Sequence, residues 1–315
     1  MTVYDIALRL TTLYEQPVID ARHDLRVRPL NDGLTQRLDS FDLAIWPSPS
    51  RRHERIDYFA NGVTSVTLAE PHTVFEMAMM ARVERFATRS FSADLPLQGL
   101  KSEIAACRDM GFDAPHHYLG ESPHIPFRAE IRDYAHQAMP ASGQVQDILT
   151  MLMAAIHRDF AFDDTATTVE TALADAFWLR RGVCQDFAHV MIACLRSIGI
   201  PAGYVSGFLR TEPPDGQMRL EGADAMHAWV RAWCGHQAGW VECDPTNDIF
   251  VNDNHIAVAH GRDYDDALPI VGFVSTAGVQ QTKQAVDVIP VCPDADPQAS
   301  QHDQTQGQGH EIGAR

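Results

Sequence analysis

Three short stretches of this chain carry residues whose types suit nucleophilic attack on an acyl group. Cys184 follows Gly182 by two positions, while His227 and Asp244 lie in two later stretches. A cysteine attacks as its thiolate, a histidine can pair with that thiolate and carry the proton, and an aspartate can hold the histidine in one tautomer. Together the three residues predict a Cys184–His227–Asp244 catalytic triad.

Cys184 is expected at the start of a helix, where a thiolate is favoured. Apolar residues recur after it at helical spacing, and Gly199 and Pro201 then provide stop signals. The N–H groups of a first helical turn and the helix dipole both favour negative charge. They would therefore stabilise the thiolate and could bind an oxyanion. The apolar face comprises Phe187, Ala188, Met191, Ile192, Leu195 and Ile198.

His227 and Asp244 are expected on neighbouring antiparallel strands, because the residues around both have strand patterns. His227 would reach Cys184 by a tertiary contact, and Asp244 would accept a hydrogen bond from the second ring nitrogen of His227. Trp229 and Trp240 are expected to flank the histidine and the aspartate and to limit water around them.

Each of the three residues also has a structural interpretation when it is taken singly. A buried cysteine is most often an inert small hydrophobe. A strand histidine is often structural, and an aspartate before proline often starts a turn. The prediction therefore rests on the joint layout of a helix-start cysteine, a strand histidine and an aspartate on the next strand.

Other polar residues near the predicted helix start are interpreted as supporting. His189 follows Cys184 by five positions on the same helix, so it points roughly 140° away at about 100° per residue. A packing or hydrogen-bonding role is expected for it. Gln185 and Asp186 fall in the first turn, where an aspartate complements the helix dipole.

Neither a metal site nor a cofactor site is expected. Cys234, His236 and Cys243 surround one predicted hairpin, but the paired ligand spacing of a zinc module is absent. The sequence contains no glycine-rich phosphate loop and no dinucleotide-binding fingerprint.

Composition restricts the class of partner. The chain has 315 residues, 45% hydrophobic and 21% charged, which is typical of a globular protein with room for two domains. A formal net charge of -17 repels phosphate backbones and anionic lipid, so neither nucleic acid nor a membrane is expected as a partner. The beginning of the chain lacks a secretory pattern, and no apolar run approaches about 18 residues. Six cysteines without a Cys-x-x-Cys pair then indicate free thiols and a cytoplasmic protein.

The patterns along the chain divide it into four parts. Residues 1–85 are expected to form an N-terminal β domain, and residues 86–143 a helical connecting segment. Residues 144–292 are expected to form the catalytic core, with helices first and strands after, which indicates an α+β fold. Residues 293–315 have few large apolar side chains and are expected to be a disordered tail.

Individual elements can also be assigned. Tyr4 to Leu10 and Phe75 to Val83 alternate at the strand period, and Asn61-Gly62 is expected to form a tight turn between two further strands. Helical patterns cover residues 128–138, 144–160 and 168–178, and strand patterns cover residues 202–209, 225–233 and 239–243. The last strands of the core are expected within residues 254–292.

These residues resemble the transglutaminase-like cysteine superfamily, in its bacterial two-domain branch. The resemblance implies Cys184 as nucleophile, His227 as base and Asp244 as the residue that orients the base. It also implies a papain-like core, in which helices pack on an antiparallel sheet, preceded by an N-terminal β domain. It rests on residues 181–189, 195–202, 204–208, 227–229, 239–240, 244–247 and 260–266, and on Asn61-Gly62 and Pro71-His72.

Two positions depart from the pattern of that family. Gly203 stands where an arginine is usual, and Arg231 lies in the segment 230–232, where an acidic residue is usual. Both departures could alter the substrate cleft.

The triad and the resemblance together predict a thiol-dependent acyl-transfer enzyme that acts on a peptide or protein. The first hypothesis is a cysteine peptidase or amidase that hydrolyses a peptide or isopeptide amide through a thioester. The alternative enzyme is a transglutaminase, in which an amine resolves the thioester and crosslinks proteins. A non-catalytic protein-binding relative is a third class, and the intact triad argues against it. Acyl transfer from a thioester cofactor, as in the arylamine acetyltransferases that share Arg-Gly-x-Cys, has no further support, and the oligomeric state is left open.

Overall fold

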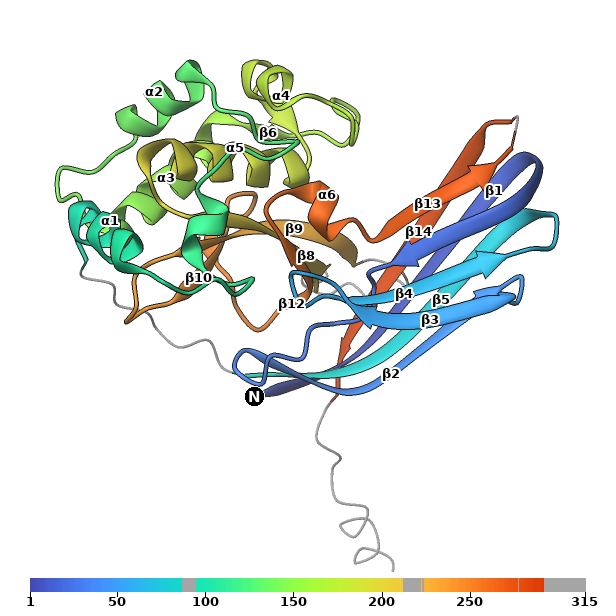
Figure 1. Ribbon diagram of the computed structural model, residues 1–315. Helices are drawn as coiled ribbons and strands as arrows, with labels where there is room; N and C mark the ends of the chain where they lie inside the picture. Colours follow the sequence, from blue (N-terminus) through green and yellow to red (C-terminus); the bar gives the residue numbers. More distant parts are fainter. Residues whose placement is uncertain (87–94, 212–221, 223, 277, 292–315) are drawn as a thin grey trace, which may run out of the picture.

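The computed structural model describes residues 1–86, 95–211, 222, 224–276 and 278–291. Figure 1 shows a group of helices on one side, a long-stranded β domain on the other, and a second sheet between them. The mixed helix and strand content confirms the predicted α+β fold with an N-terminal β region. The predicted tail, 293–315, lies outside the described residues.

The N-terminal β domain is built on its first strand. That strand pairs on one side with β5 and on another part of its length with β4, and the outer strands β2 and β3 complete the order β2-β5-β1-β4-β3. The alternating residues of the first and fifth strands are buried as predicted, including Tyr4, Leu8 and Met79. The strands are β1 (Thr2–Leu25), β2 (Gln36–Trp46), β3 (Arg51–Ile56), β4 (Gly62–Leu68) and β5 (His72–Arg85).

The last two strands of the chain join this domain, which corrects the sequence-based division. The sequence predicts that all strands of residues 254–292 belong to the catalytic core. In the structure, β13 (Ile270–Ser275) and β14 (Gln280–Pro290) instead pair with β1. The physical reason is that β14 adds its buried Val286 and Val288 to the apolar cluster of the β domain. Strand pairing between opposite ends of a chain leaves no local pattern in the sequence.

The hairpin of β3 and β4 exists, but its predicted Asn61-Gly62 turn is wrong. The last paired residues are Ile56 and Gly62, so the loop spans residues 57–61 and the positive φ falls on Ala60. Asn61 is fully buried and turns its amide towards the core. Nδ2 of Asn61 donates to the His260 carbonyl, and Oδ1 of Asn61 accepts from the His260 N–H, both at 2.8 Å.

In the part of the chain between β5 and β13, most helices precede the strands of the core sheet, and they include those of the predicted connecting segment, residues 86–143. The helices are α1 (Leu97–Ala106), a 3-10 turn η1 (Pro115–Tyr118), α2 (Ala129–Gln137), α3 (Val145–Asp159), α4 (Leu173–Leu179) and α5 (Cys184–Ile198), and α6 (Tyr264–Ala267) comes later. A short parallel pair, β6 (Ala161–Phe162) and β7 (Arg181–Gly182), leads into α5. The core sheet has the order β11-β10-β9-β8-β12. Its strands are β8 (Ala202–Leu209), β9 (Ala225–Trp233), β10 (Trp240–Asp244), β11 (Ile249–Phe250) and β12 (His255–Gly261).

The core sheet is buried on both faces. One face packs Ala228 and Val230 of β9 against α5 and the other helices. The opposite face carries Phe208 of β8 and Ile256 of β12 into the apolar cluster of the β domain. The core sheet is therefore the layer that the helices and the β domain share (Figure 1).

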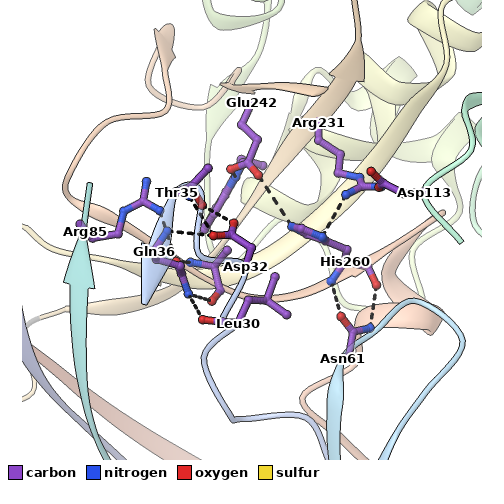
Figure 2. Close-up of polar contacts among 12 residues, drawn as sticks. Leu30, Asp32, Thr35, Gln36, Asn61, Arg85, Asp113, Arg231, Glu242 and His260 are labelled. Carbon is purple, nitrogen blue, oxygen red and sulfur yellow. Dashed lines mark hydrogen bonds and ion pairs between the residues drawn. The ribbon is translucent and has the colours of Figure 1, made fainter. Parts of the chain in front are cut away.

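Two buried amides of the β domain cover the outer edge of β12, and Figure 2 shows both. Gln36 donates from Nε2 to the Ala257 carbonyl at 2.8 Å, and its Oε1 accepts from the Ala257 N–H at 2.9 Å. Asn61 makes the equivalent pair with His260. Because an uncovered edge strand leaves its N–H and C=O groups unpaired, these side chains act as the missing neighbour of β12.

Candidate active site

Cys184 is the first residue of α5 and is partly exposed. The Asp186 carboxylate fixes this helix end, because it accepts from the Val183 N–H at 2.8 Å and from the Thr167 hydroxyl at 2.7 Å. A Cβ on Gly182 would collide with that carboxylate, so any larger residue would displace it from the helix end. The predicted helix start and the supporting role of Asp186 are therefore both observed.

The other described cysteines have different surroundings. Cys194, Cys234 and Cys243 are buried, and burial raises the pKa of all three thiols, that of Cys234 to about 12. Cys107 is partly exposed at the end of α1, where the helix dipole does not favour a thiolate. Cys184 alone among the described cysteines combines partial exposure with a helix N-terminus.

The structure brings the three predicted triad residues together. His227 on β9 lies close enough to Cys184 for the thiol to raise its pKa, and its Nε2 lies 2.8 Å from Asp244 Oδ2 at the end of β10. Since Nε2 faces the carboxylate, Nδ1 is the ring nitrogen left for the thiol. His227 is 8% exposed and Asp244 is fully buried, so their hydrogen bond lies out of bulk water.

Electrostatics favour a charged pair at this site. Burial alone would lower the pKa of His227, but the hydrogen bonds with Asp244 and Cys184 outweigh burial and raise that pKa to about 10. Burial opposes the charge of Asp244 too, but the hydrogen bonds from His227, His255 and Asn247 hold its pKa well below the usual range. The arrangement therefore favours an imidazolium on His227 beside an ionised Asp244 carboxylate.

Asp244 has two further side-chain partners that the sequence analysis missed. Asn247 Nδ2 donates to Asp244 Oδ2 at 2.6 Å, and His255 Nε2 lies 3.2 Å from the same oxygen. The other oxygen, Oδ1, accepts from the backbone N–H groups of Thr246 and Asn247. Asn247 belongs to the stretch 244–247 that resembles the superfamily, whereas a single histidine at the start of β12 carries no local signal.

Two tyrosines also lie near the nucleophile. Burial raises the pKa of both Tyr204 and Tyr264, and the charge of Cys184 adds to this rise. Tyr264 begins α6, and its N–H donates to Nε2 of His189 at 3.2 Å. His189 thus has the expected packing and hydrogen-bonding role, and burial lowers its pKa to about 3.

One of the two predicted flanking tryptophans is in place. Trp229 is fully buried, with its ring centroid 6.1 Å from that of His227. Trp240 instead pairs with Trp233 at the other end of β9, where its ring contacts Tyr118. The prediction that Trp240 flanks the triad is therefore wrong, because the β9–β10 hairpin carries it to the far end of the strand.

The residues that could hold a metal ion coincide with this hydrogen-bonded cluster. Ligand atoms of His227, Asp244 and His255 lie within 4.8 Å of one another, and the described residues contain no other such group of histidine, cysteine or acidic side chains. The separations of 2.8 and 3.2 Å from Asp244 Oδ2 are those of N–H···O hydrogen bonds. A metal ion would therefore have to displace the Nε2 protons of both His227 and His255, and it would have to enter a buried site.

Comparison with known families decides the classification. The model of the transglutaminase-like superfamily matches residues 132–245, and the model of the bacterial transglutaminase-like N-terminal region matches residues 4–84. The chain belongs to the transglutaminase-like superfamily. The match of the superfamily core spans all three triad positions, and the second match covers the β domain described above.

The similar proteins differ in how much of their own length the match covers. The chain is 32% identical over 279 residues to an uncharacterised protein of Mycobacterium tuberculosis, covering 84% of this chain and 85% of the relative. Over 122 residues it is 33% identical to a protein-glutamine gamma-glutamyltransferase of Pseudomonas aeruginosa, which is 38% of this chain and 18% of that protein. The crystal structure of a proposed cysteine protease from Cytophaga hutchinsonii has the same fold. It has a TM-score of 0.71 at 20% identity and covers 93% of this chain and 92% of that one.

The two departures from the superfamily pattern form one local arrangement. Gly203 on β8 and Arg231 on β9 are cross-strand partners. A Cβ at Gly203 would collide with the ring of Tyr118, so no arginine fits there. Arg231 instead stacks over Tyr118 and Trp240 and pairs with Asp113. Figure 2 shows the links of Arg231 to Asp113 and His260.

Within the described part of the chain, no helix is long and apolar enough to cross a membrane. The cytoplasmic location stays a prediction from the sequence.

Proposed function

We propose that this protein is a cysteine peptidase or amidase that cleaves a peptide or isopeptide amide through a thioester on Cys184. The observation that carries the proposal is the buried hydrogen bond between His227 and Asp244, with the partly exposed Cys184 thiol in contact with the same imidazole. This arrangement supplies a nucleophile, a proton carrier and an orienting carboxylate in the order that acyl transfer requires.

The first half-reaction forms the thioester. The Cys184 thiolate attacks the carbonyl carbon, and the electron pair of the C=O bond moves onto oxygen. N–H groups in the first turn of α5 can hold this oxyanion, and the helix dipole favours it. When the C–N bond breaks, the proton of the His227 imidazolium passes to the leaving amine.

The second half-reaction returns the enzyme. Water attacks the thioester carbon while His227 takes up a proton from it, and the C–S bond breaks to release the acid. The restored thiolate and imidazolium form the starting pair again. Asp244 accepts a hydrogen bond from His227 throughout and keeps Nδ1 directed at the sulfur and the substrate.

Transglutaminase activity is the second candidate, because it differs only in the acceptor. The similarity to the glutamyltransferase of Pseudomonas aeruginosa over 122 residues favours this alternative. Hydrolysis needs only water at the partly exposed Cys184, whereas transamidation needs an additional site for the amine. We therefore place hydrolysis first.

Mass spectrometry of the full chain incubated with a library of glutamine-containing peptides separates these activities. The incubation is done with and without a primary amine, beside Cys184→Ala as the inactive control. Cleaved or deamidated peptides that require Cys184 support the hydrolase, and amine adducts on glutamine support the transglutaminase. If the wild type forms neither product although its thiol is reactive, the catalytic proposal is wrong for this substrate class and a protein-binding role gains support.

A further inference from the structure

His255 lies between the proposed triad and the N-terminal β domain. It begins β12, is fully buried, and has its Nε2 3.2 Å from Asp244 Oδ2. Its Nδ1 lies 3.1 Å from Asn252 Oδ1. An ionised carboxylate only accepts hydrogen bonds, so the proton of this contact belongs to His255 Nε2.

Asp244 needs such donors because it has no exposure to water. An ionised carboxylate in a buried site takes up a proton unless hydrogen bonds compensate the lost hydration. A protonated Asp244 would no longer stabilise the imidazolium form of His227. Each donor on this carboxylate therefore helps to keep the proposed thiolate–imidazolium pair in acid.

The β domain holds the segment that carries His255. Arg85, at the end of β5, donates from Nη2 to the Asn252 carbonyl at 3.3 Å, and Asn252 in turn contacts His255. Ala257 follows His255 by two residues, and the Gln36 side chain makes hydrogen bonds with both its N–H and its carbonyl group. Gln36 is fully buried and Arg85 is 4% exposed, so neither side chain competes with solvent for these bonds.

We propose that His255 is a positioning residue for the triad, and that the N-terminal β domain holds it there through Arg85 and Gln36. This inference rests on the proposed function, because it concerns the same thiol. The inference gives the β domain a part in the active site. Its contacts with β12 hold His255, the donor that keeps Asp244 ionised and directed at His227.

The groups that face the triad are few. Asp244 faces His227 of β9 and His255 of β12, and His227 also faces Cys184 of α5. On the outer side of Cys184, the phenols of Tyr204 and Tyr264 are the titratable neighbours. Neither tyrosine titrates in the acidic range, since burial raises both pKa values. The Asp186 carboxylate in the first turn of α5, whose pKa burial raises, is present in every variant. The difference in midpoint between wild type and variants therefore reports on the contact of His255 with Asp244.

The test is the pH dependence of alkylation, which needs no substrate. The rate at which iodoacetamide modifies Cys184 is measured from pH 4 to 8 in the full chain, and the rate of Cys184→Ala is subtracted as background. His255→Phe keeps a ring but removes the donor, and His255→Gln keeps a donor near Nε2. We expect His255→Phe to move the acidic midpoint upward by about one pH unit, so that the rate below that midpoint falls about tenfold. His255→Gln is expected to restore most of the loss.

Other outcomes overturn the inference. An unchanged acidic midpoint in both variants excludes the donor role, and a larger shift in His255→Gln than in His255→Phe means that the ring only packs. Equal shifts of the acidic midpoint in the two variants mean that the hydrogen bond from His255 to Asp244 does not set this midpoint. Arg85→Met serves if His255→Phe does not fold, and we expect it to shift the same midpoint upward by a smaller amount. If alkylation of the wild type does not depend on Cys184, the proposed function itself fails, which is a separate result.

Discussion

Asp244 Oδ2 is shared by three side-chain donors, from His227, His255 and Asn247. This sharing explains why a carboxylate without any exposure can remain charged, and why His227 is held with one nitrogen towards the thiol. At the scale of single residues, the proposed chemistry depends on the side chains that donate hydrogen bonds to this oxygen.

Reactivity should be confined to Cys184. We expect Cys184→Ala to abolish labelling by a small electrophile at pH 6, whereas Cys194→Ala should label like the wild type. Cys194 is fully buried with a raised pKa, so it offers neither access nor thiolate. Intact-mass spectrometry after timed labelling measures the effect, and equal labelling of the two variants would contradict the assignment of the nucleophile.

The His227–Asp244 pair should also make stability depend on pH. The pKa of His227 is raised from 6.5 to about 10 in the folded protein, so its contribution is fully present below about pH 6.5 and is lost as pH rises towards 10. We therefore expect Asp244→Asn to lower the free energy of unfolding more at pH 6 than at pH 10, with a difference of about 1–3 kcal/mol.

Urea unfolding of both proteins at the two pH values measures this difference. Groups that titrate equally in wild type and variant cancel in the comparison. A gap between the two proteins that is the same at pH 6 and pH 10 would show that the raised pKa of His227 does not depend on Asp244.

The residues of the site could be predicted only where their chemistry and local pattern coincide. Cys184, His227 and Asp244 each stand in a recognisable motif, and the structure brings them together. His255 lacks such a motif, because its partner Asp244 precedes it on another strand and the contact exists only after folding. Trp240 was misplaced since a hairpin register cannot be read from the loop alone.

At the scale of elements, α5 begins where Gly182 allows the Asp186 carboxylate to approach the backbone. The strands that carry His227 and its neighbours match their predicted bounds, residues 202–209 and 225–233, because their patterns are local and strongly apolar. The turn at Asn61 failed for the opposite reason. Its amide bonds to His260 in another domain, and that tertiary contact overrides the preference of Asn-Gly for a tight turn.

The start of α5 can be tested through its glycine. Gly182→Ala should lower the free energy of unfolding by about 1–3 kcal/mol, because the added methyl group displaces the Asp186 carboxylate from the helix end. We expect the labelling rate of Cys184 to fall with it. Gly120→Ala is the matched control, since nothing lies within 4 Å of its Cβ position. Guanidinium unfolding measures the stability of the two variants, and thiol labelling measures the reactivity of Cys184 in each. Equal stability of the two variants would contradict this account of the helix start.

At the scale of the whole molecule, the core sheet ends at β12, and the β domain supplies the neighbour which that strand lacks. Gln36 and Asn61 each satisfy both backbone groups of one residue on β12. The two parts of the molecule therefore share hydrogen bonds as well as apolar packing, which favours their unfolding as one unit.

The strands and the tail of the C-terminal region, residues 270–315, should contribute differently to the stability of the fold. Deleting residues 293–315, which lie outside the described residues, should leave the unfolding midpoint nearly unchanged, as their composition predicts. Deleting residues 270–315 should prevent stable folding, because β1 then loses β13 and β14. Thermal unfolding followed by circular dichroism compares the two deletions. A large loss of stability in the shorter deletion, or a normal midpoint in the longer one, would contradict this division.

The pairing of β1 with β14 has a consequence during synthesis. On one edge of β1, Tyr4 to Tyr14 pair with residues 280–290, so this neighbour is synthesised long after the first strand, whereas the other edge pairs with the earlier β5. At about 5–20 residues per second, translation of a chain of this length takes roughly 15–60 s. Until residues 280–290 are made, the edge of β1 that β14 covers has no partner from its own chain, and such an unpaired edge can pair with other nascent chains.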